Sequence, residues 1–184
     1  MGVMFRNGKF YGGTIESDNS SEVGQVDTTE GASNHGEIFN DYTSNKATGL
    51  NSHAEGSGTT ASGYYSHSEG STTNATADTA HAEGSGTTAS GYASHAEGSD
   101  TTATAGSSHT EGSGTKASSA NQHVQGKFNV EDAAGTYAMI IGNGTSDTAR
   151  SNALTVDWSG NVACGTINGI DISDLLTRII AIES

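Results

Sequence analysis

Large apolar side chains lie near the two ends of this chain, and the middle lacks them. From His53 to Gln122 the sequence contains no Leu, Ile, Val, Met, Phe, Trp, Cys or Pro. A conventional hydrophobic core cannot form there, so the segment is either disordered or built from a repeated unit ordered by backbone pairing and stacking. The periodicity of its small and polar residues decides between these two interpretations.

Six histidines mark a repeat of fourteen residues. They are His53, His67, His81, His95, His109 and His123. The surrounding sequence is Ser-His-Ala-Glu-Gly at 52–56 and 94–98, and close variants stand at 66–70, 80–84, 108–112 and 122–126. An alanine follows each of the first five histidines by eight residues. Placing Phe39 at the histidine position gives a degenerate first repeat, which is typical of a cap.

The repeat predicts an all-β solenoid. Fourteen residues also equal two heptads, but a coiled coil needs apolar a and d positions and helix formers, whereas Gly, Ser and Thr dominate here. One repeat fits one turn made of two short strands separated by glycine-bearing bends, with alternate side chains facing in and out. Because so few apolar side chains are available for burial, we expect lateral partners, and a homotrimer is the natural candidate.

The unit Ser-His-Ala-Glu-Gly followed by Thr-Thr-Ala-Ser-Gly resembles the head repeat of trimeric autotransporter adhesins. The resemblance covers about residues 39–126, with five good copies and one weak copy. It implies a left-handed parallel β-roll in which three chains lie side by side. The sequence departs from the usual family pattern at the His and Glu positions, where the family typically carries apolar residues.

Outside the repeats the composition changes sharply. Residues 3–11 predict a tight hairpin turning at Asn7-Gly8, for which docking to a larger assembly and a frayed terminus are the two interpretations. Residues 121–168 resemble a region common in phage and prophage tail fibres, which favours a phage appendage over a cell-anchored adhesin. We predict four regions: 1–38, a hairpin and polar linker; 39–126, the solenoid; 127–168, a small β neck or cap; and 169–184, a trimerising helix.

The C-terminal segment predicts a short coiled coil, because its apolar residues have the spacing of a and d positions. These residues are Ile172, Leu175, Ile179 and Ile182. Packing onto the neck as an ordinary amphipathic helix is the alternative.

Histidine and glutamate two residues apart in a strand project from the same face, so successive turns align their pairs. We call this column the His–Glu ladder. Its members are His53, Glu55, His67, Glu69, His81, Glu83, His95, Glu97, His109, Glu111 and His123. Our hypothesis places the ladder at the contact between protomers, where the pKa of each glutamate falls and that of each histidine rises. A solvated ladder on the outer surface is the alternative.

We expect no metal, no cofactor and no catalysis. Rows of His and Glu can ligate zinc, but the sequence has no structural Cys/His zinc spacing, and a site repeated five times indicates architecture more than catalysis. The net charge of −14 argues against a nucleic-acid partner. No apolar run approaches the roughly 20 residues that span a bilayer, so we expect no membrane insertion.

Three functional classes follow from these patterns. The favoured class is a trimeric adhesive fibre of a virion or cell surface. In this class Tyr64, Tyr65 and Tyr92 offer stacking platforms for a surface glycan. Its other possible partners are a protein receptor and a phage baseplate or tail component. The second class is a passive virion spacer or decoration without a ligand. The least favoured class is an enzyme, a depolymerase or a self-cleaving chaperone, because no unique nucleophile–base or carboxylate pair stands out.

Overall fold

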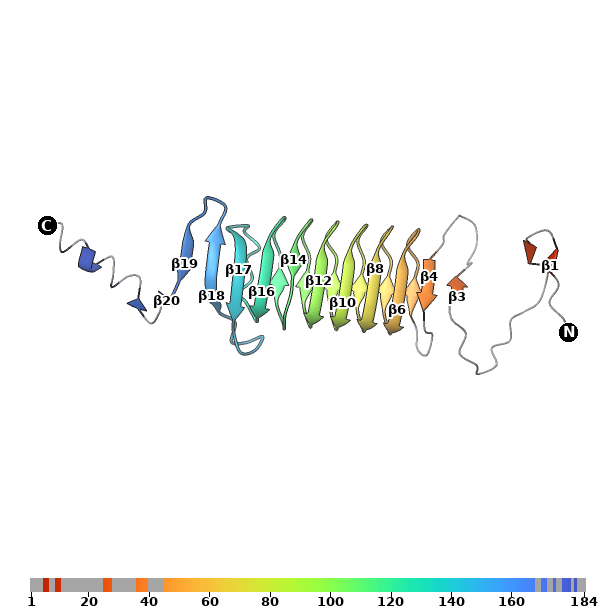
Figure 1. Ribbon diagram of the computed structural model, residues 1–184, viewed down its shortest axis with the longest axis horizontal. Helices are drawn as coiled ribbons and strands as arrows, with labels where there is room; N and C mark the ends of the chain where they lie inside the picture. Colours follow the sequence, from red (N-terminus) through yellow and green to blue (C-terminus); the bar gives the residue numbers. More distant parts are fainter. Residues whose placement is uncertain are drawn as a thin grey trace.

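The fold is all-β, and a computed structural model describes it for most of the chain. The described residues are 45–167 together with 5–6, 9–10, 25–27, 36–39, 170–171, 174, 177–179 and 181. Strands stack side by side along the long axis of the molecule (Figure 1) and form a β-solenoid of about seven turns. The prediction of a β-solenoid with one turn per repeat is therefore confirmed.

Two sheets form the walls of the solenoid. The large sheet contains, in chain order, β3 (Gln25–Asp27), β4 (Gly36–Phe39), β6 (His53–Ser57), β8 (His67–Ser71), β10 (His81–Ser85), β12 (His95–Ser99), β14 (His109–Thr110), β16 (His123–Lys127), β17 (Tyr137–Asn143), β18 (Asn152–Asp157) and β19 (Val162–Cys164). The small sheet contains β5 (Lys46–Ala47), β7 (Thr60–Ala61), β9 (Asn74–Ala75), β11 (Thr88–Ala89), β13 (Thr102–Ala103) and β15 (Lys116–Ala117).

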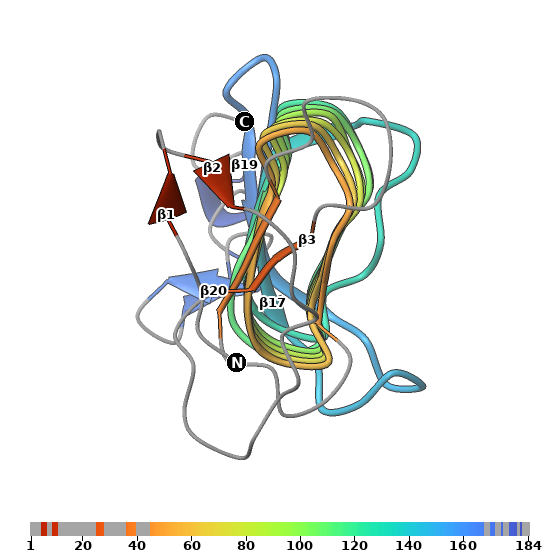
Figure 2. The ribbon, with the colours of Figure 1, turned by 90° about the vertical axis from the view of Figure 1, so that its right-hand side faces the viewer.

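The strands of the histidine repeats pair in the register that the fourteen-residue period dictates. In the large sheet, β10 pairs in parallel with β12 so that His81 lies beside His95 and Glu83 beside Glu97. In the small sheet, the parallel pair β11 and β13 places Ala89 beside Ala103. Each residue therefore stacks on its equivalent in the next turn, and the turns superimpose when the solenoid is viewed near its axis (Figure 2).

The register differs at the first turn. There β4 places Glu37 beside His53 and Phe39 beside Glu55. The prediction that Phe39 occupies the histidine position is therefore wrong.

Small side chains fill the interior. Alanines from both sheets are buried, among them Ala82 and Ala96 in the large sheet and Ala75, Ala89 and Ala103 in the small sheet. A column of threonines is also fully buried: Thr59, Thr73, Thr87, Thr101 and Thr115. Among the residues whose burial the structure describes, larger apolar side chains enter the core only near the last turn, where Val124 and Ile140 are buried with Ala117.

Asparagine side chains continue the threonine column at both ends. Thr59 donates its backbone N–H to Asn45 Oδ1 at 3.0 Å. At the other end, Lys116 donates its N–H to Asn129 Oδ1 at 2.8 Å, and Asn129 Nδ2 donates to the Lys116 carbonyl at 3.0 Å. Each amide thus takes the place of a neighbouring strand for the terminal turn, which satisfies backbone groups that would otherwise be buried without partners.

Glycine is required at the bend that follows each His-x-Glu. Gly84 has a φ of +107°, and a β-carbon added there would lie 2.1 Å from the carbonyl oxygen of Gly98 in the next turn. Gly70 and Gly98 have the same conformation and the same close approach. An L-residue with a side chain fits neither the backbone angle nor the space between turns.

Beyond the last histidine repeat, three strands extend the large sheet. β17 pairs in parallel with β16, and β18 and β19 then add antiparallel strands. Two short antiparallel pairs lie outside the solenoid sheets: β1 (Phe5–Arg6) with β2 (Lys9–Phe10), and β20 (Thr166–Ile167) with β21 (Ile170–Asp171). Asn7 and Gly8, the predicted turn of the first pair, lie outside the described residues.

The predicted coiled-coil segment is described only in part. Asp174, residues 177–179 and Ala181 are helical. Ile179 is exposed, and Ile172, Leu175 and Ile182 lie outside the described residues. The coiled coil therefore stays a prediction.

Candidate functional site: the His–Glu ladder

The ladder lies on the outer face of the large sheet. In each full strand, the residue between His and Glu points into the core, as Ala82 does between His81 and Glu83, so both titratable side chains must project outward. The paired side chains of this face are partly exposed, from 31% to 44% of their surface. In a single chain the ladder faces solvent, and whether another protomer covers it stays a hypothesis.

The imidazole rings form a continuous stack along the solenoid. Ring centroids are 4.7 Å apart from His67 to His81, from His81 to His95 and from His95 to His109, with interplanar angles of 14°, 3° and 12°. The stack is less regular at both ends, where His53 meets His67 edge-on and His123 is tilted against His109. The ring spacing equals the distance between paired strands, so the backbone register sets the stack.

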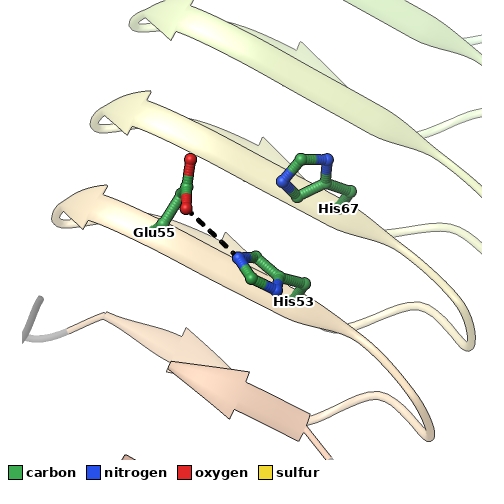
Figure 3. A group of neighbouring side chains, drawn as sticks. All are labelled: His53, Glu55 and His67. Atoms are coloured by element: carbon green, nitrogen blue, oxygen red, sulfur yellow. Dashed lines mark hydrogen bonds and ion pairs between the residues drawn. The ribbon is translucent and has the colours of Figure 1, made fainter. Parts of the chain in front are cut away.

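Each glutamate lies beside the histidine of its own strand in four turns. The Nε2–Oε2 distance is 3.3 Å for His53 and Glu55, which is short enough for a hydrogen bond (Figure 3). In the next three turns the distance lengthens to 3.7, 3.8 and 3.9 Å. Ion pairs this exposed contribute about 0–1 kcal/mol each, so the pairs do not account for the stability of the fold.

Several imidazole nitrogens have no hydrogen-bond partner. The Nε2 atoms of His81, His95, His109 and His123 are covered from solvent and lack one. The nearest glutamate carboxylates of His81, His95 and His123 lie 3.7 to 3.9 Å away, too far for a hydrogen bond. Covered nitrogen atoms of this kind lose their interaction with water without replacing it.

The lowered pKa values of three ladder histidines reflect burial and the stacking of each imidazole on another. Burial lowers the pKa of His67, His81 and His109, and neighbouring imidazoles lower it further. The cause is that a protonated ring is poorly hydrated here and repels the next protonated ring.

Neighbouring carboxyls share protons along the glutamate column. A hydrogen bond to Glu83 and then burial raise the pKa of Glu97 to about 7. Burial and hydrogen bonds to Glu55 and Glu83 raise the pKa of Glu69. The pKa of Glu83 falls because Glu83 accepts the hydrogen bond from Glu97. Within one chain, the directions expected from the sequence hold for Glu83 and are reversed for the other shifted groups of the ladder.

Three groups of ladder residues bring possible metal ligands together. They are His53, Glu55 and His67; His81, Glu83 and His95; and His95, Glu97 and His109. Within each group one ligand atom per residue lies within 4.8 Å of the other two. The fourteen-residue period predicted that these side chains align, but no metal was expected, because the sequence lacks a structural Cys/His zinc spacing and repeats the pair in five turns.

The three tyrosines that the sequence singled out lie at the bend that follows the small-sheet strands. Tyr64, Tyr65 and Tyr92 are 55%, 59% and 65% exposed. Tyr64 and Tyr92 occupy the same repeat position two turns apart, and Asp78 holds that position between them. The Tyr64 N–H donates to Asp78 Oδ1 at 2.9 Å, and the Tyr64 and Tyr92 carbonyls accept hydrogen bonds from Thr79 and Ser107. The backbone of this bend is held in place while the rings face solvent.

The fold and the ladder define the chain as a β-solenoid repeat protein. Comparison of the chain with protein-family models, curated proteins and solved structures finds no match. Within the part of the chain that the structure describes, no helix is both long enough and apolar enough to cross a membrane.

Proposed function

We propose that this chain is one protomer of a homotrimeric adhesive fibre, a phage or prophage tail appendage that contacts a bacterial cell surface. Its location is then the virion or the cell exterior. In this proposal the solenoid is a left-handed β-roll, residues 127–168 form a neck and residues 169–184 form the trimerising helix. The resemblance of the repeat to adhesin heads and of residues 121–168 to tail fibres supports the proposal.

The composition of the interior is the observation that supports lateral assembly most. The core of the central turns consists of alanine, serine and threonine side chains, so each turn buries little apolar area. Stacking supplies neighbours along the axis only, and the first and last turns of a thin rod gain least from it. Association with two further copies buries additional surface for every turn at once.

We place the contact between protomers on the ladder face. This face carries the same pair of side chains in successive turns, so a partner that fits one turn fits the next in the same register. The proton shared between Glu83 and Glu97 lowers the charge that would have to be buried. The face would then set the alignment of three otherwise similar rods.

The exposed tyrosines support the adhesive role. Tyr64 and Tyr92 stand two turns apart, about 10 Å along the axis, with the Asp78 carboxylate between them. Aromatic faces stack on sugar rings, and a carboxylate accepts hydrogen bonds from hydroxyl groups. A glycan lying along the bend would contact both kinds of group.

The test is binding of the purified full chain to bacterial cells and to a panel of surface glycans. The triple substitution Tyr64→Ala, Tyr65→Ala and Tyr92→Ala is expected to reduce binding at least tenfold without changing the melting temperature, since all three rings face solvent. The matched control is Val162→Ala, which removes another exposed apolar side chain, on β19.

Two results would redirect the proposal. If the wild-type chain binds no cell and no glycan, the passive virion spacer becomes the better hypothesis for its function. If it binds and the tyrosine variant binds equally well, adhesion uses another surface. A bacterial surface-adhesin head would show the same tyrosine dependence, and detection of the protein in purified virions distinguishes the two origins. Release of saccharide from the panel would instead favour an enzyme.

A further inference from the structure

We propose that the His–Glu ladder binds divalent transition-metal ions, with zinc the best match, between successive turns of one chain. Each ion is held by the imidazoles of two neighbouring turns and by the glutamate on the strand of the first of them. The proposal goes beyond the adhesive function, and its ligands all belong to a single chain.

The ligand chemistry selects the class of ion. Imidazole nitrogen and carboxylate oxygen are both zinc ligands, whereas calcium and magnesium are bound by oxygen ligands. Each of the three groups offers two nitrogens and one oxygen. Three protein ligands leave a fourth tetrahedral position open to water. The missing Cys/His spacing does not count against such a site, because its histidines are fourteen residues apart and meet only through the stacking of turns.

The distances lie close to those of a zinc site. Ligand atoms around a tetrahedral zinc ion are about 3.3 Å apart, given bond lengths of about 2.0–2.1 Å. His53 Nε2 and Glu55 Oε2 are already 3.3 Å apart (Figure 3). For His81 with Glu83 and for His95 with Glu97 the distances are 3.8 and 3.9 Å. The ligand atoms of each group all lie within 4.8 Å of one another, so the two imidazoles must rotate out of their parallel stack to bring both nitrogens to about 3.3 Å from each other.

In the second and third groups, the nitrogens that would bind the ion lack hydrogen-bond partners in the protein. His81, His95 and His109 supply the imidazoles of the second and third groups, and the Nε2 atom of each is covered and accepts or donates no hydrogen bond. An ion at the Nε2 edge of two neighbouring rings would engage both atoms at once, because the nitrogen lone pair lies in the plane of each ring. The surrounding charge also favours a cation, since the glutamates form a column of like groups in a chain of net charge −14.

The sharing of His95 limits how many ions bind. His95 belongs to both the second and the third group. If each Nε2 binds one ion, only one of these two groups can be filled at a time. The His53, Glu55 and His67 group shares no residue with either. The expected stoichiometry is therefore two ions per chain.

The test is calorimetric titration of the metal-free full chain with zinc chloride, together with the visible spectrum of the cobalt(II)-loaded protein. Wild type is expected to bind two ions per chain and to show the intense absorption of tetrahedral cobalt. His95→Gln removes a ligand from two groups at once and should lower the stoichiometry to one. His123→Gln is the matched control, because His123 is stacked in the same column but belongs to none of the three groups.

The glutamates give a second, sharper test. Glu83→Gln alone should leave two ions per chain, because the group with Glu97 replaces the one with Glu83. The double substitution Glu83→Gln and Glu97→Gln should leave one. All of these side chains lie on the ladder face, so far-ultraviolet circular dichroism and light scattering of each variant check that the solenoid and the proposed trimer are retained.

Three outcomes would overturn the proposal. One is a wild-type chain that binds no zinc at micromolar concentration. Another is equal loss of zinc from His95→Gln and His123→Gln, which would indicate diffuse attraction to an acidic surface. The third is an octahedral cobalt spectrum in wild type, which would mean that water and carboxylates hold the ion without the imidazoles.

Discussion

At the scale of single residues, backbone angles explain the sequence better than side-chain contacts do. The glycine after each His-x-Glu has a φ near +107° and a carbonyl oxygen of the next turn where its β-carbon would be. A second column also has positive φ, with glycine at 58, 86 and 114, but threonine at 72 and aspartate at 100. The first column therefore excludes every side chain, and the second only disfavours one.

This difference predicts opposite effects for two substitutions. Gly84→Ala should lower the free energy of unfolding by about 2–4 kcal/mol, because it combines an unfavourable φ with a clash against Gly98. Thr72→Gly should raise it by about 0.5–1 kcal/mol, because Thr72 is a β-branched residue with a φ of 58°. Urea unfolding followed by circular dichroism measures both, and equal effects of the two changes would contradict the account.

The glutamate column predicts a pH effect for one residue. The pKa of Glu97 is raised to about 7 from 4.5, so its contribution to stability is fully present below pH 4.5 and is lost as the pH rises through 7. Glutamine mimics the protonated carboxyl. In chelator-containing buffer, Glu97→Gln should therefore match wild type near pH 4.5 and exceed it by less than about 1 kcal/mol at pH 8, given the exposure of the site.

Thermal melting at the two pH values provides the measurement for Glu97→Gln. Glu55→Gln, on the same face at the first turn of the stack, is the comparison, since no glutamate of an earlier turn precedes it in the ladder. A Glu97→Gln variant that is less stable than wild type at pH 8 would show that the carboxylate there is favourable as an ion.

At the scale of elements, the repeat behaves as an interchangeable unit. The turns that carry the histidine repeats contribute equivalent strands to each sheet, in a register that is set by the fourteen-residue period. Removing one whole period keeps every column aligned, whereas removing half a period places outward side chains in the interior. The solenoid therefore tolerates the loss of a whole repeat. It does not tolerate a shift in which residues of each repeat face the interior.

Deletion of residues 81–94 should accordingly give a folded solenoid that is one turn shorter. Deletion of residues 81–87 should prevent the turns on either side from pairing. Circular dichroism and limited proteolysis distinguish the two products, with protease resistance expected only for the first. If both deletions are equally resistant, the columns do not determine the fold.

Hydroxyl pairing inside the rod shows a finer match between elements. Where the position after histidine is Ser68 or Thr110, its hydroxyl lies 2.7 Å from that of Thr73 or Thr115. In the turns where that position is alanine, the threonine Oγ1 has no hydrogen-bond partner, as at Thr87 and Thr101. The repeats therefore differ in whether the buried threonine hydroxyl has a hydrogen-bond partner, although their backbone conformation is the same.

At the scale of the whole molecule, the fourteen-residue period was enough to predict the solenoid architecture. The end caps and the side-chain distances of the ladder could not be predicted from it. The spacing of His53 and its equivalents was sufficient to place one turn per repeat, two strands per turn and the ladder on one face. The Asn45 and Asn129 caps could not be predicted, because each asparagine replaces a threonine only once, at an end of the column. The period also aligned the members of the His-Glu-His groups, but it could not give the distances between their ligand atoms, which depend on side-chain rotamers.

Three features of a single chain are not explained by its own fold. Its interior is narrow and made of small residues, its ladder face carries four covered Nε2 atoms without hydrogen-bond partners, and its tyrosines face solvent. Lateral assembly of three rods would bury more surface around the small-residue interior, and ions between turns would bind the Nε2 atoms that lack partners. The exposed tyrosines are the feature that neither assembly nor metal binding explains, and a glycan ligand is proposed for them.

The native mass of the full chain in solution, measured by multi-angle light scattering at neutral pH, tests the central claim most directly. The trimeric fibre predicts 3 × 18.6 = 55.8 kDa. A monomer of 18.6 kDa that keeps its β-sheet signal would contradict the account, because the small-residue solenoid would then be stable without lateral partners.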